Sequence, residues 1–307
     1  MKMVQKLIME EKAMNRKSLT LTIIANMTSN YGEGLGNIST IQKVSRNGKT
    51  YPTRSRESLK NAIMVESGMY DDLETVVNGA TQKAVSKELN ATNCRALEGG
   101  YMNTADSTYI RKSSFYLTDA VACNEFVMEN RFHNNLYLAN NFAKANNINL
   151  QQKAGETGLM PYQYEYDKSF KVYSLTVDLN MIGKDENFNS QEASSEEKAS
   201  RVNSILNAVQ NLSLVVKGNL DNAEPLFIVG GLVNRKTHYF ENVVKVKDNK
   251  LEITNDLKER IANGCMVGLL EGGNFDNENI IKEELKPLTI RNFFKQLEKE
   301  VNEYYGV

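Results

Sequence analysis

The order of strand-like and helix-like segments limits the fold of this chain more than any other feature of its sequence. Residues 18–26 alternate Leu and Ile with Thr, which is the period of a strand with one buried face. Ser55 suits the N-cap of a helix, and residues 170–183 alternate as a second strand. A helix follows Ser194, and residues 226–234 read as an apolar strand. This order predicts an α+β fold.

Strand, helix, strands, helix, strand is the split βαβ or ferredoxin-like pattern, which is also the RNA-recognition fold. We expect a single such domain over residues 1–307 with a long insertion at about 70–166 and an acidic linker at about 184–195. The helix after the linker opens with a capping box, in which Glu197 follows Ser194, and it is expected to end at Gly218. A C-terminal helix has an apolar stripe of Ile290, Phe293, Phe294, Leu297 and Val301.

The composition excludes several kinds of site. The chain has 2 histidines, and its 3 cysteines are widely spaced without a CxxC pair. Neither a disulfide framework, nor a zinc site, nor histidine-based catalysis is expected, and no cofactor is implied. No apolar run reaches the ~20 residues of a membrane helix. The charged N-terminus does not resemble a secretory signal, so we expect a cytoplasmic protein with no membrane partner.

The distribution of charge is more informative than its sum. The formal net charge is −1, yet residues 43–60 hold six basic residues and one acid, Glu57, which gives +5 and leaves −6 for the rest. Part of the negative charge lies at residues 185–197. Separated charge of this kind can steer a polyanion to one part of a protein.

The end of the basic segment carries the groups that phosphate oxygens need. Arg54, Ser55, Arg56 and Lys60 surround the predicted start of a helix, where cations, hydroxyls and backbone N–H groups come together. A solvated helix face would have the same pattern, because Arg56 and Lys60 are four residues apart. The segment is therefore a candidate nucleic-acid site with a purely structural alternative.

Three weaker signals allow two interpretations each. Gly32, Gly34 and Gly36 form a GxGxG loop, which favours a flexible loop close to a ligand over a dinucleotide site, because no apolar helix follows directly. The Lys217-Gly218-Asn219 turn offers a cation and free amides, or is only a helix end. Alternating tyrosines at 162–166 could stack on unpaired bases, or belong to an ordinary exposed hairpin.

Five segments together suggest a known family. They are LTLTIIANMTSN, TYPTRSRESLKNAIM, RKSSFYLTDAVA, KVYSLTVDLNMIG and VNSILNAVQNLSLVVKGNLDNAEPLFIVGG, in this order between residues 19 and 231. The set resembles the DevR-type CRISPR-associated autoregulators, the guide-RNA-binding backbone subunits of type I-B Cascade complexes in the RAMP superfamily. The resemblance is weak at residues 70–150 and over the last seventy residues.

The resemblance implies a modified RNA-recognition fold with palm, fingers and thumb. It also implies copies that stack head to tail on one CRISPR RNA, together with other Cascade subunits, and present the guide for pairing with a target DNA strand. Such subunits bind the RNA backbone without regard to sequence, and they are not nucleases in type I systems.

Carried onto this sequence, the resemblance implies a set of site residues. The implied RNA ligands are Asn26, Arg54, Ser55, Arg56, Lys60, Arg111, Lys112, Lys217, Gly218 and Asn219. The thumb is expected near residues 156–166, with Met160 as a wedge and Tyr162 as a stacking residue. The turn reads KGNL, which is less glycine-rich than the family pattern.

Two enzymatic alternatives remain. Backbone subunits of other CRISPR types cut bound target RNA with a loop aspartate, a role open to Asp71, Asp72 or Asp106. A nucleotide-binding enzyme would use the loop from Gly32 to Gly36 instead.

Overall fold

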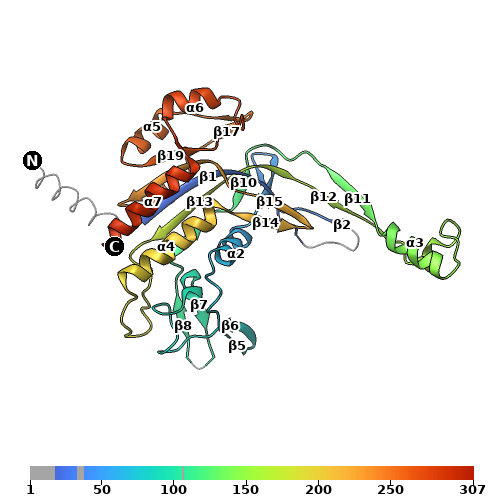
Figure 1. The fold of residues 1–307 in the computed structure, drawn as a ribbon, viewed down its shortest axis with the longest axis horizontal. Helices are drawn as coiled ribbons and strands as arrows, with labels where there is room; N and C mark the ends of the chain where they lie inside the picture. The colour runs from blue at the N-terminus through green and yellow to red at the C-terminus, as the bar shows by residue number, and fades with distance from the viewer. Residues whose placement is uncertain (1–17, 33–37, 106) are drawn as a thin grey trace, which may run out of the picture.

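Four antiparallel strands form the centre of one large sheet in the computed structural model, which describes residues 18–32, 38–105 and 107–307 (Figure 1). Their spatial order is β16 (Pro225–Val233), β1 (Ser18–Thr28), β13 (Lys168–Asp178) and β10 (Ala120–Ala122). The helix α2 (Arg56–Glu66) lies between β1 and β10 in the chain, and α4 (Ser195–Gln210) lies between β13 and β16. This order and connectivity are those of a ferredoxin-like fold, so the predicted α+β class is confirmed.

Further strands widen the sheet at both edges. At one edge are β19 (Met266–Leu269) and β20 (Leu288–Thr289), at the other β4 (Lys49–Arg54) and β3 (Lys43–Arg46), and β9 (Phe115–Leu117) pairs with β13 beside β10. None of the helices in the described ranges is long and apolar enough to cross a membrane.

One face of the sheet is covered by α2, α4 and α7 (Ile290–Tyr305) (Figure 1). Leu19, Leu21 and Ile23 point from β1 into this layer and are fully buried. All five residues of the predicted stripe on α7 are buried there as well. The central sheet and these helices are together called the palm here. Apolar burial of this kind supplies its main stabilisation.

The other face of β1 is also buried, which the alternation of Thr with Leu did not predict. Thr20 and Thr22 are 0% exposed. The chain after β16 crosses over them, and the Thr20 hydroxyl donates to the Thr237 carbonyl at 3.2 Å, while Thr22 and Ser174 share a 2.7 Å hydrogen bond. Threonine hydroxyls therefore reach the interior because each has a partner.

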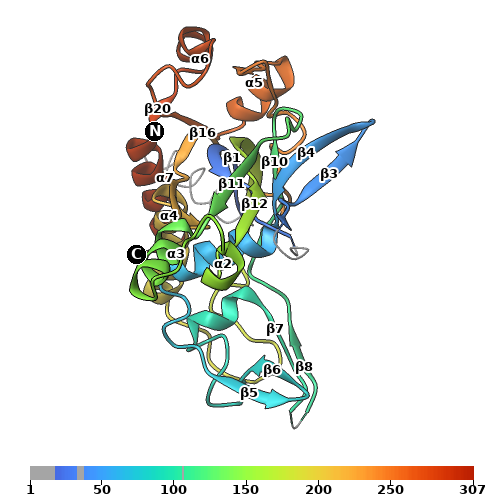
Figure 2. The same cartoon turned by 90° about the vertical axis from the view of Figure 1, so that its right-hand side faces the viewer.

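The predicted insertion at 70–166 is in fact two insertions, because residues 115–122 return to the sheet as β9 and β10. The first insertion, residues 67–114, contains η1 (Arg95–Gly99) and the hairpins β5 (Thr75–Asn78) with β6 (Ala80–Lys83) and β7 (Tyr101–Asn103) with β8 (Tyr109–Arg111). The second insertion, residues 123–167, is named the arm here. Figures 1 and 2 show them leaving the sheet in different directions.

The arm consists of an antiparallel ladder and a helical tip. Its elements are β11 (Asn130–Asn134), α3 (Leu136–Ala145), η2 (Ala154–Thr157) and β12 (Pro161–Glu165). At its base, β12 pairs in parallel with β2 (Ile38–Ser39). The helix α3 lies at the far end of the arm, away from the sheet (Figure 1).

The predicted helix end at Gly218 is wrong. The N-cap half of the capping box is confirmed, since Ser194 Oγ accepts from Glu197 N, whereas the Glu197 carboxylate accepts from Arg95 and Arg201. The helix α4 ends at Gln210. A hairpin follows, formed by β14 (Ser213–Val216) and β15 (Asn219–Asn222). Lys217 and Gly218 have φ angles of 50° and 81°, as the two central residues of a type I′ turn require.

The C-terminal part adds a second core on the face of the sheet opposite α4. It includes β17 (Val246–Lys247), β18 (Lys250–Leu251), α5 (Asn255–Ala262) and α6 (Glu278–Leu285). Phe240 and Phe275 are buried there against Phe227 of β16. This layer leaves the β10–β13 part of the face uncovered around a groove described below.

Candidate nucleic-acid interface

The start of α2 has the predicted cap. Ser55 Oγ accepts from Ser58 N at 3.2 Å, and Ser55 N donates to Asn30 Oδ1 at 2.8 Å. Arg56 N donates to Asp119 Oδ1 at 2.8 Å. The Arg56 side chain is exposed and pairs with Glu57 at 2.6 Å, and this hydrogen bond raises the pKa of Arg56. Arg56 can therefore reach a phosphate from the protein surface.

Arg54 lies inside the protein instead of on this surface. It is 4% exposed, and its Nε donates to the Thr28 carbonyl at 3.1 Å while Nη1 donates to Ser58 Oγ at 2.9 Å. Burial lowers the pKa of Arg54 to about 10, although the nearby Asp221 opposes this shift. In this geometry Arg54 holds the end of β1 against the start of α2 and offers little to a ligand.

Lys60 is directed toward the first insertion. Its Nζ donates to the Gly99 carbonyl and to Ser113 Oγ, both at 2.8 Å, and lies 4.8 Å from the centroid of the Phe115 ring. Burial, with a smaller contribution from Lys83, lowers the pKa of Lys60 to about 8. The shared outward face expected for Arg56 and Lys60 is therefore not formed.

Arg111 and Lys112 are adjacent in the sequence but differ in exposure. Arg111 is 4% exposed, and Nη2 lies 3.1 Å from Glu98 Oε2 in a fully buried ion pair that also includes Arg201. Lys112, next in sequence, is exposed. Of this pair, only Lys112 is placed to meet a ligand in the structure as it stands.

The remaining charges of the basic segment are mostly neutralised within the chain. Lys43 pairs with Glu165 at 2.5 Å, and Lys49 pairs with Glu125 at 3.3 Å. Arg46 is exposed and has no partner among the described residues. The +5 segment therefore does not form one continuous basic face.

The acidic linker is neutralised in the same way. Glu192 pairs with Lys184 at 2.9 Å and with Lys198 at 2.6 Å, while Asp185 is 7% exposed and accepts from the Tyr101 hydroxyl. Its acids therefore do not form an open negative face opposite the basic segment.

Asn26 lies near the end of β1, opposite Phe170 in the ladder with β13. Its Oδ1 is buried and has no hydrogen-bond donor among the described residues. A buried acceptor without a donor is unusual and would be satisfied by a ligand or water. Its predicted role as a polar contact is compatible with this position.

An aromatic column runs along one face of the arm. The rings of Tyr162 and His133 are stacked with centroids 5.5 Å apart, and those of His133 and Tyr164 are 4.9 Å apart and nearly parallel. Tyr164 in turn meets Tyr31 edge to face at 5.9 Å. Tyr162 is 45% exposed and Tyr164 is 9% exposed, so the column has one open end and one buried end.

The column connects to the β14–β15 turn. Lys217 Nζ lies 5.0 Å from the centroid of the Tyr31 ring and 3.4 Å from Ser39 Oγ. A cation over an aromatic face is attracted by the ring quadrupole. The structure thus places Lys217 beside Tyr31, at the end of the column that lies away from Tyr162.

The column also reaches the start of α2. Tyr31 follows Asn30, the residue whose side chain accepts from Ser55 N. The Tyr31 hydroxyl donates to the Glu165 carbonyl at 2.7 Å, and burial raises the pKa of Tyr31 to about 12. Tyr31 therefore stays neutral and fixes the base of the arm to the palm.

The predicted thumb segment, residues 156–166, lies in the arm. Met160 is 56% exposed between η2 and β12, and its N–H donates to Asn135 Oδ1 at 2.7 Å. The arm also exposes many apolar side chains, which is typical of a contact surface. They are Val127, Met128, Phe132, Leu136, Tyr137, Leu138, Phe142, Met160 and Tyr162.

Of the three aspartates considered for ribonuclease chemistry, the structure describes Asp71 and Asp72. Asp72 caps η1 by accepting from Arg95 N and Ala96 N, and its carboxylate is occupied by these bonds. Asp106, Gly34, Gly36 and residues 1–17 lie outside the described residues. No group of three or more His, Cys, Asp or Glu side chains in the described ranges could hold a metal ion.

Sequence reasoning missed Tyr31, His133 and Asp221. His133 lies in a polar stretch, and its place between two tyrosines depends on the register of β11 with β12, in which His133 opposes Tyr162. Asp221 Oδ2 accepts from Thr28 N at 2.7 Å and so joins β15 to the end of β1. Only the spacing of the tyrosines at 162–166 gave a usable signal.

The fold and this surface define a class of protein. A chain in a "CRISPR RNA-guided surveillance complex" shares the fold with a TM-score of 0.51 at 13% identity, over 83% of this chain and 90% of that one. A chain in a "CRISPR RNA-guided surveillance complex, pre-nicking" has a TM-score of 0.52 at 11% identity, over 83% of this chain and 93% of that one. The architecture is therefore that of subunits found in such complexes.

The sequence identifies the family within this class. The family described as "CRISPR-associated negative auto-regulator DevR/Csa2" matches residues 19–255. The chain belongs to the DevR/Csa2 family of CRISPR-associated proteins, which confirms the resemblance inferred from the sequence segments. No curated protein matches the chain in sequence.

Proposed function

We propose that this chain binds single-stranded RNA along a surface that begins at the start of α2 and continues up the arm. The observation that carries the proposal is the connection from Arg56 and Ser55 through Asn30 to Tyr31 and the aromatic column, with Lys217 over Tyr31. Cations at a helix start bind phosphate, and an open aromatic ring stacks on a base. The family and the fold are those of CRISPR-associated subunits.

The chemistry of this surface favours binding without sequence preference. A phosphate contact from Arg56 or Lys217 is the same for every nucleotide. Stacking on the ring of Tyr162 is also tolerant of sequence, because every base has a π-face. A subunit that must hold any guide sequence needs both properties.

The family likeness supports a finer version of the proposal. The RNA is a CRISPR guide RNA, several copies of this chain stack head to tail along it with other Cascade subunits, and the guide pairs with a target DNA strand. The apolar surface of the arm is available for such contacts between subunits. In this role the chain acts in the cytoplasm as a structural subunit of a type I-B complex and does not cut RNA.

A double variant tests the RNA surface. We expect Arg56→Ala with Lys217→Ala to weaken binding to a labelled single-stranded RNA and to reduce the slope of log K against log salt by about 1.4, because about 0.7 is lost per phosphate contact. A control with Lys295→Ala and Lys299→Ala removes the same charge from exposed positions on α7. An unchanged slope in the first variant would contradict the assigned surface.

The residues chosen for substitution differ from those that the sequence alone would suggest. Arg54 and Lys60 would be natural targets, but both make internal hydrogen bonds. Their removal would change the fold together with any binding. Arg56 and Lys217 are exposed, so their replacement should disturb the fold less, although Arg56 pairs with Glu57 and Lys217 contacts Tyr31.

A further inference from the structure

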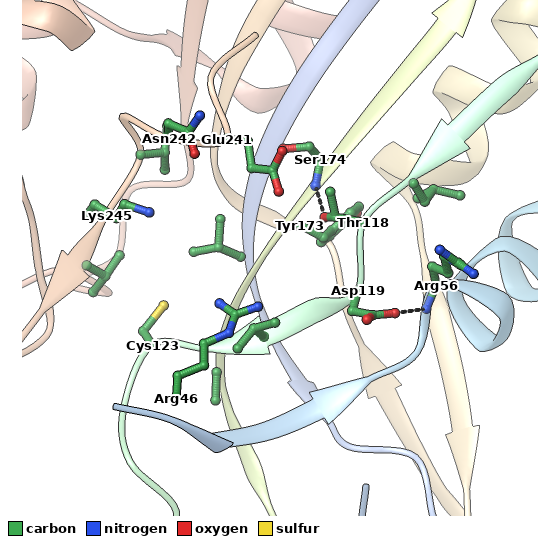
Figure 3. A pocket seen from close by; sticks show the side chains of 16 residues that line it. Arg46, Arg56, Thr118, Asp119, Cys123, Tyr173, Ser174, Glu241, Asn242 and Lys245 are labelled. Atoms are coloured by element: carbon green, nitrogen blue, oxygen red, sulfur yellow. Dashed lines mark hydrogen bonds between the residues drawn. The ribbon is translucent and has the colours of Figure 1, made fainter. Parts of the chain in front are cut away.

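A groove on the sheet extends beyond the surface described so far and shares Arg56 with it. It has a volume of about 540 Å³ and opens on the face opposite the helices (Figure 3). Its floor includes Val121 and Val172, which oppose each other across the β10–β13 ladder. The β3–β4 hairpin forms one wall, and residues 241–246 form the opposite wall.

The two walls carry cations without partners. The side chains of Arg46, from the hairpin, and of Lys245, from the other wall, both extend into the groove (Figure 3). Both are exposed, and neither side chain has an ion-pair or hydrogen-bond partner within the described ranges. This contrasts with Lys43 and Lys49 on the same hairpin, which are paired.

The groove combines positive rims with an apolar floor. An anion between Arg46 and Lys245 would relieve the repulsion between them and accept charge-assisted hydrogen bonds. Val121 and Val172 offer a flat apolar surface to an uncharged part of the same ligand. Glu241, whose carboxylate lies near Ser174 (Figure 3), keeps the site from being uniformly positive and can accept from amino groups.

A nucleotide unit has this combination of groups. A phosphodiester supplies the anion, a sugar or base supplies the ring over the valines, and the volume is within the ~300–1,000 Å³ range of small-ligand sites. An acidic peptide fits less well, because the floor is the face of the sheet and offers no free strand edge for backbone pairing.

The groove also adjoins the start of α2. Arg56 and Asp119 both line it, and Arg56 N donates to Asp119 Oδ1 at 2.8 Å (Figure 3). A strand that contacts Arg56 can therefore continue into the groove. We infer that the groove binds one or two nucleotides of a single-stranded nucleic acid through phosphate contacts from Arg46 and Lys245, a site that rests on the RNA-binding function proposed above.

The apolar floor affects whether this site can distinguish one base from another. The side chains of Val121 and Val172 make no hydrogen bonds to base edges, so the floor adds no sequence preference, whereas Glu241 can accept from an amino group of a base. The thiol of Cys123 at the edge of the groove is not a reactive group, because burial raises its pKa to about 12.

The test is a salt titration of the full chain with a labelled single-stranded RNA and with DNA of the same sequence. Arg46→Gln and Lys245→Gln are each expected to lower the slope of log K against log salt by about 0.7, and the double variant by about 1.4. Lys247→Gln is the matched control, because Lys247 is exposed two positions from Lys245 and does not line the groove. Equal losses with RNA and DNA would show that phosphates are the groups contacted.

A second variant tests the floor without removing a cation. Val121→Glu places a carboxylate on the floor, beneath the proposed sugar or base and in the same groove as the phosphate, and is expected to weaken binding at least tenfold, while Val65→Glu on the exposed face of α2 should leave it unchanged. Circular dichroism and a thermal melt of Val121→Glu establish that the variant is folded.

Three outcomes would overturn the inference. They are a parent-like slope in the Arg46→Gln, Lys245→Gln double variant, an equal loss in Lys247→Gln, and a change in self-association with unchanged RNA binding, which would make the groove a protein-docking site. The Arg56→Ala, Lys217→Ala variant belongs in the same series. If that variant loses binding and the groove variants do not, the proposed function stands and the groove inference fails.

Discussion

Arg54 and Arg56 show how two residues of one type, two positions apart, acquire different roles. Arg54 is the last residue of β4 and points inward to the Thr28 carbonyl, whereas Arg56 is the first residue of α2 and points to solvent. The cap at Ser55 separates them, because it changes the chain from extended to helical. The positive charge that both residues carry does not show that Arg54 is a buried structural residue and Arg56 an exposed candidate ligand.

Measurements of stability and of RNA binding should therefore distinguish the role of Arg54 from that of Arg56. Arg54→Ala is expected to lower the free energy of unfolding by about 1–3 kcal/mol, because the Thr28 carbonyl and Ser58 hydroxyl lose a buried partner. Arg56→Ala should change it by less than about 0.5 kcal/mol, as expected for an exposed position, and weaken RNA binding instead. Urea denaturation provides the comparison, and equal destabilisation by both would contradict the assignment.

Lys60 predicts a pH dependence of stability. Its pKa is about 8 in the folded chain and about 10.5 when unfolded. As pH rises, Lys60 therefore loses its proton at a lower pH in the folded chain than in the unfolded chain. The contribution of Lys60 to stability therefore increases as pH rises from about 8 to about 10.5. Relative to Lys60→Met, the parent should gain roughly 1–3 kcal/mol over this window. Urea denaturation at pH 7 and pH 9.5 measures the difference, and a constant difference would exclude the shift.

At the scale of elements, the register of the arm produces its aromatic column. In the β11–β12 ladder His133 opposes Tyr162 and Arg131 opposes Tyr164, so these side chains share one face. Phe132 lies on the other face and is 68% exposed. A shift of one residue would exchange the two faces.

This register gives a matched pair of aromatic variants. Tyr162→Ala is expected to weaken RNA binding by about 1–3 kcal/mol, the usual contribution of one stacked base. Phe132→Ala removes an even more exposed ring from the opposite face and should leave RNA binding by the isolated chain unchanged. Fluorescence anisotropy with one labelled RNA compares them, and a larger loss in Phe132→Ala would place the RNA on the other face.

The first insertion is fixed to the palm by the buried cluster of Glu98, Arg111 and Arg201. Glu98 is 0% exposed and pairs with Arg111 at 3.1 Å and with Arg201 of α4 at 2.8 Å. It also accepts from Gly183 N at 2.7 Å. The one carboxylate thus joins the insertion, α4 and the loop after β13.

Glu98→Gln should therefore destabilise the fold by about 3–5 kcal/mol, because it leaves the buried Arg111 guanidinium without its counter-charge and Arg201 paired only with Glu197. Glu88→Gln, at an exposed position in the same insertion, is the control. Thermal melts and hydrogen exchange of residues 67–114 measure the effect. A loss below about 1 kcal/mol would mean that the cluster is not the anchor.

At the scale of the whole molecule, local periodicity predicted the ferredoxin-like order but not the path of the insertions. The stripe on α7 and the cap at Ser55 follow from nearby residues, and both are found. The return of the chain at β10 involves three residues without a recognisable period. The hairpin at Lys217 was mistaken for a helix end, because a glycine with positive φ serves both structures.

The candidate site was less predictable, because it depends on contacts distant in sequence. The burial of Arg54 and Arg111 is decided by Thr28 and Glu98, which no local pattern identifies. The column joins Tyr31 with residues more than a hundred positions away, such as Tyr164. Charge counting alone could not show that Lys43 and Lys49 are neutralised while Arg46 is not.

RNA binding as a function of salt, measured with two single-stranded RNAs of unrelated sequence, tests the central claim most directly. The account predicts nearly equal affinities for both RNAs and a linear fall of log K with log salt for each. No binding at low salt, or a strong preference for one sequence that persists as salt rises, would contradict it.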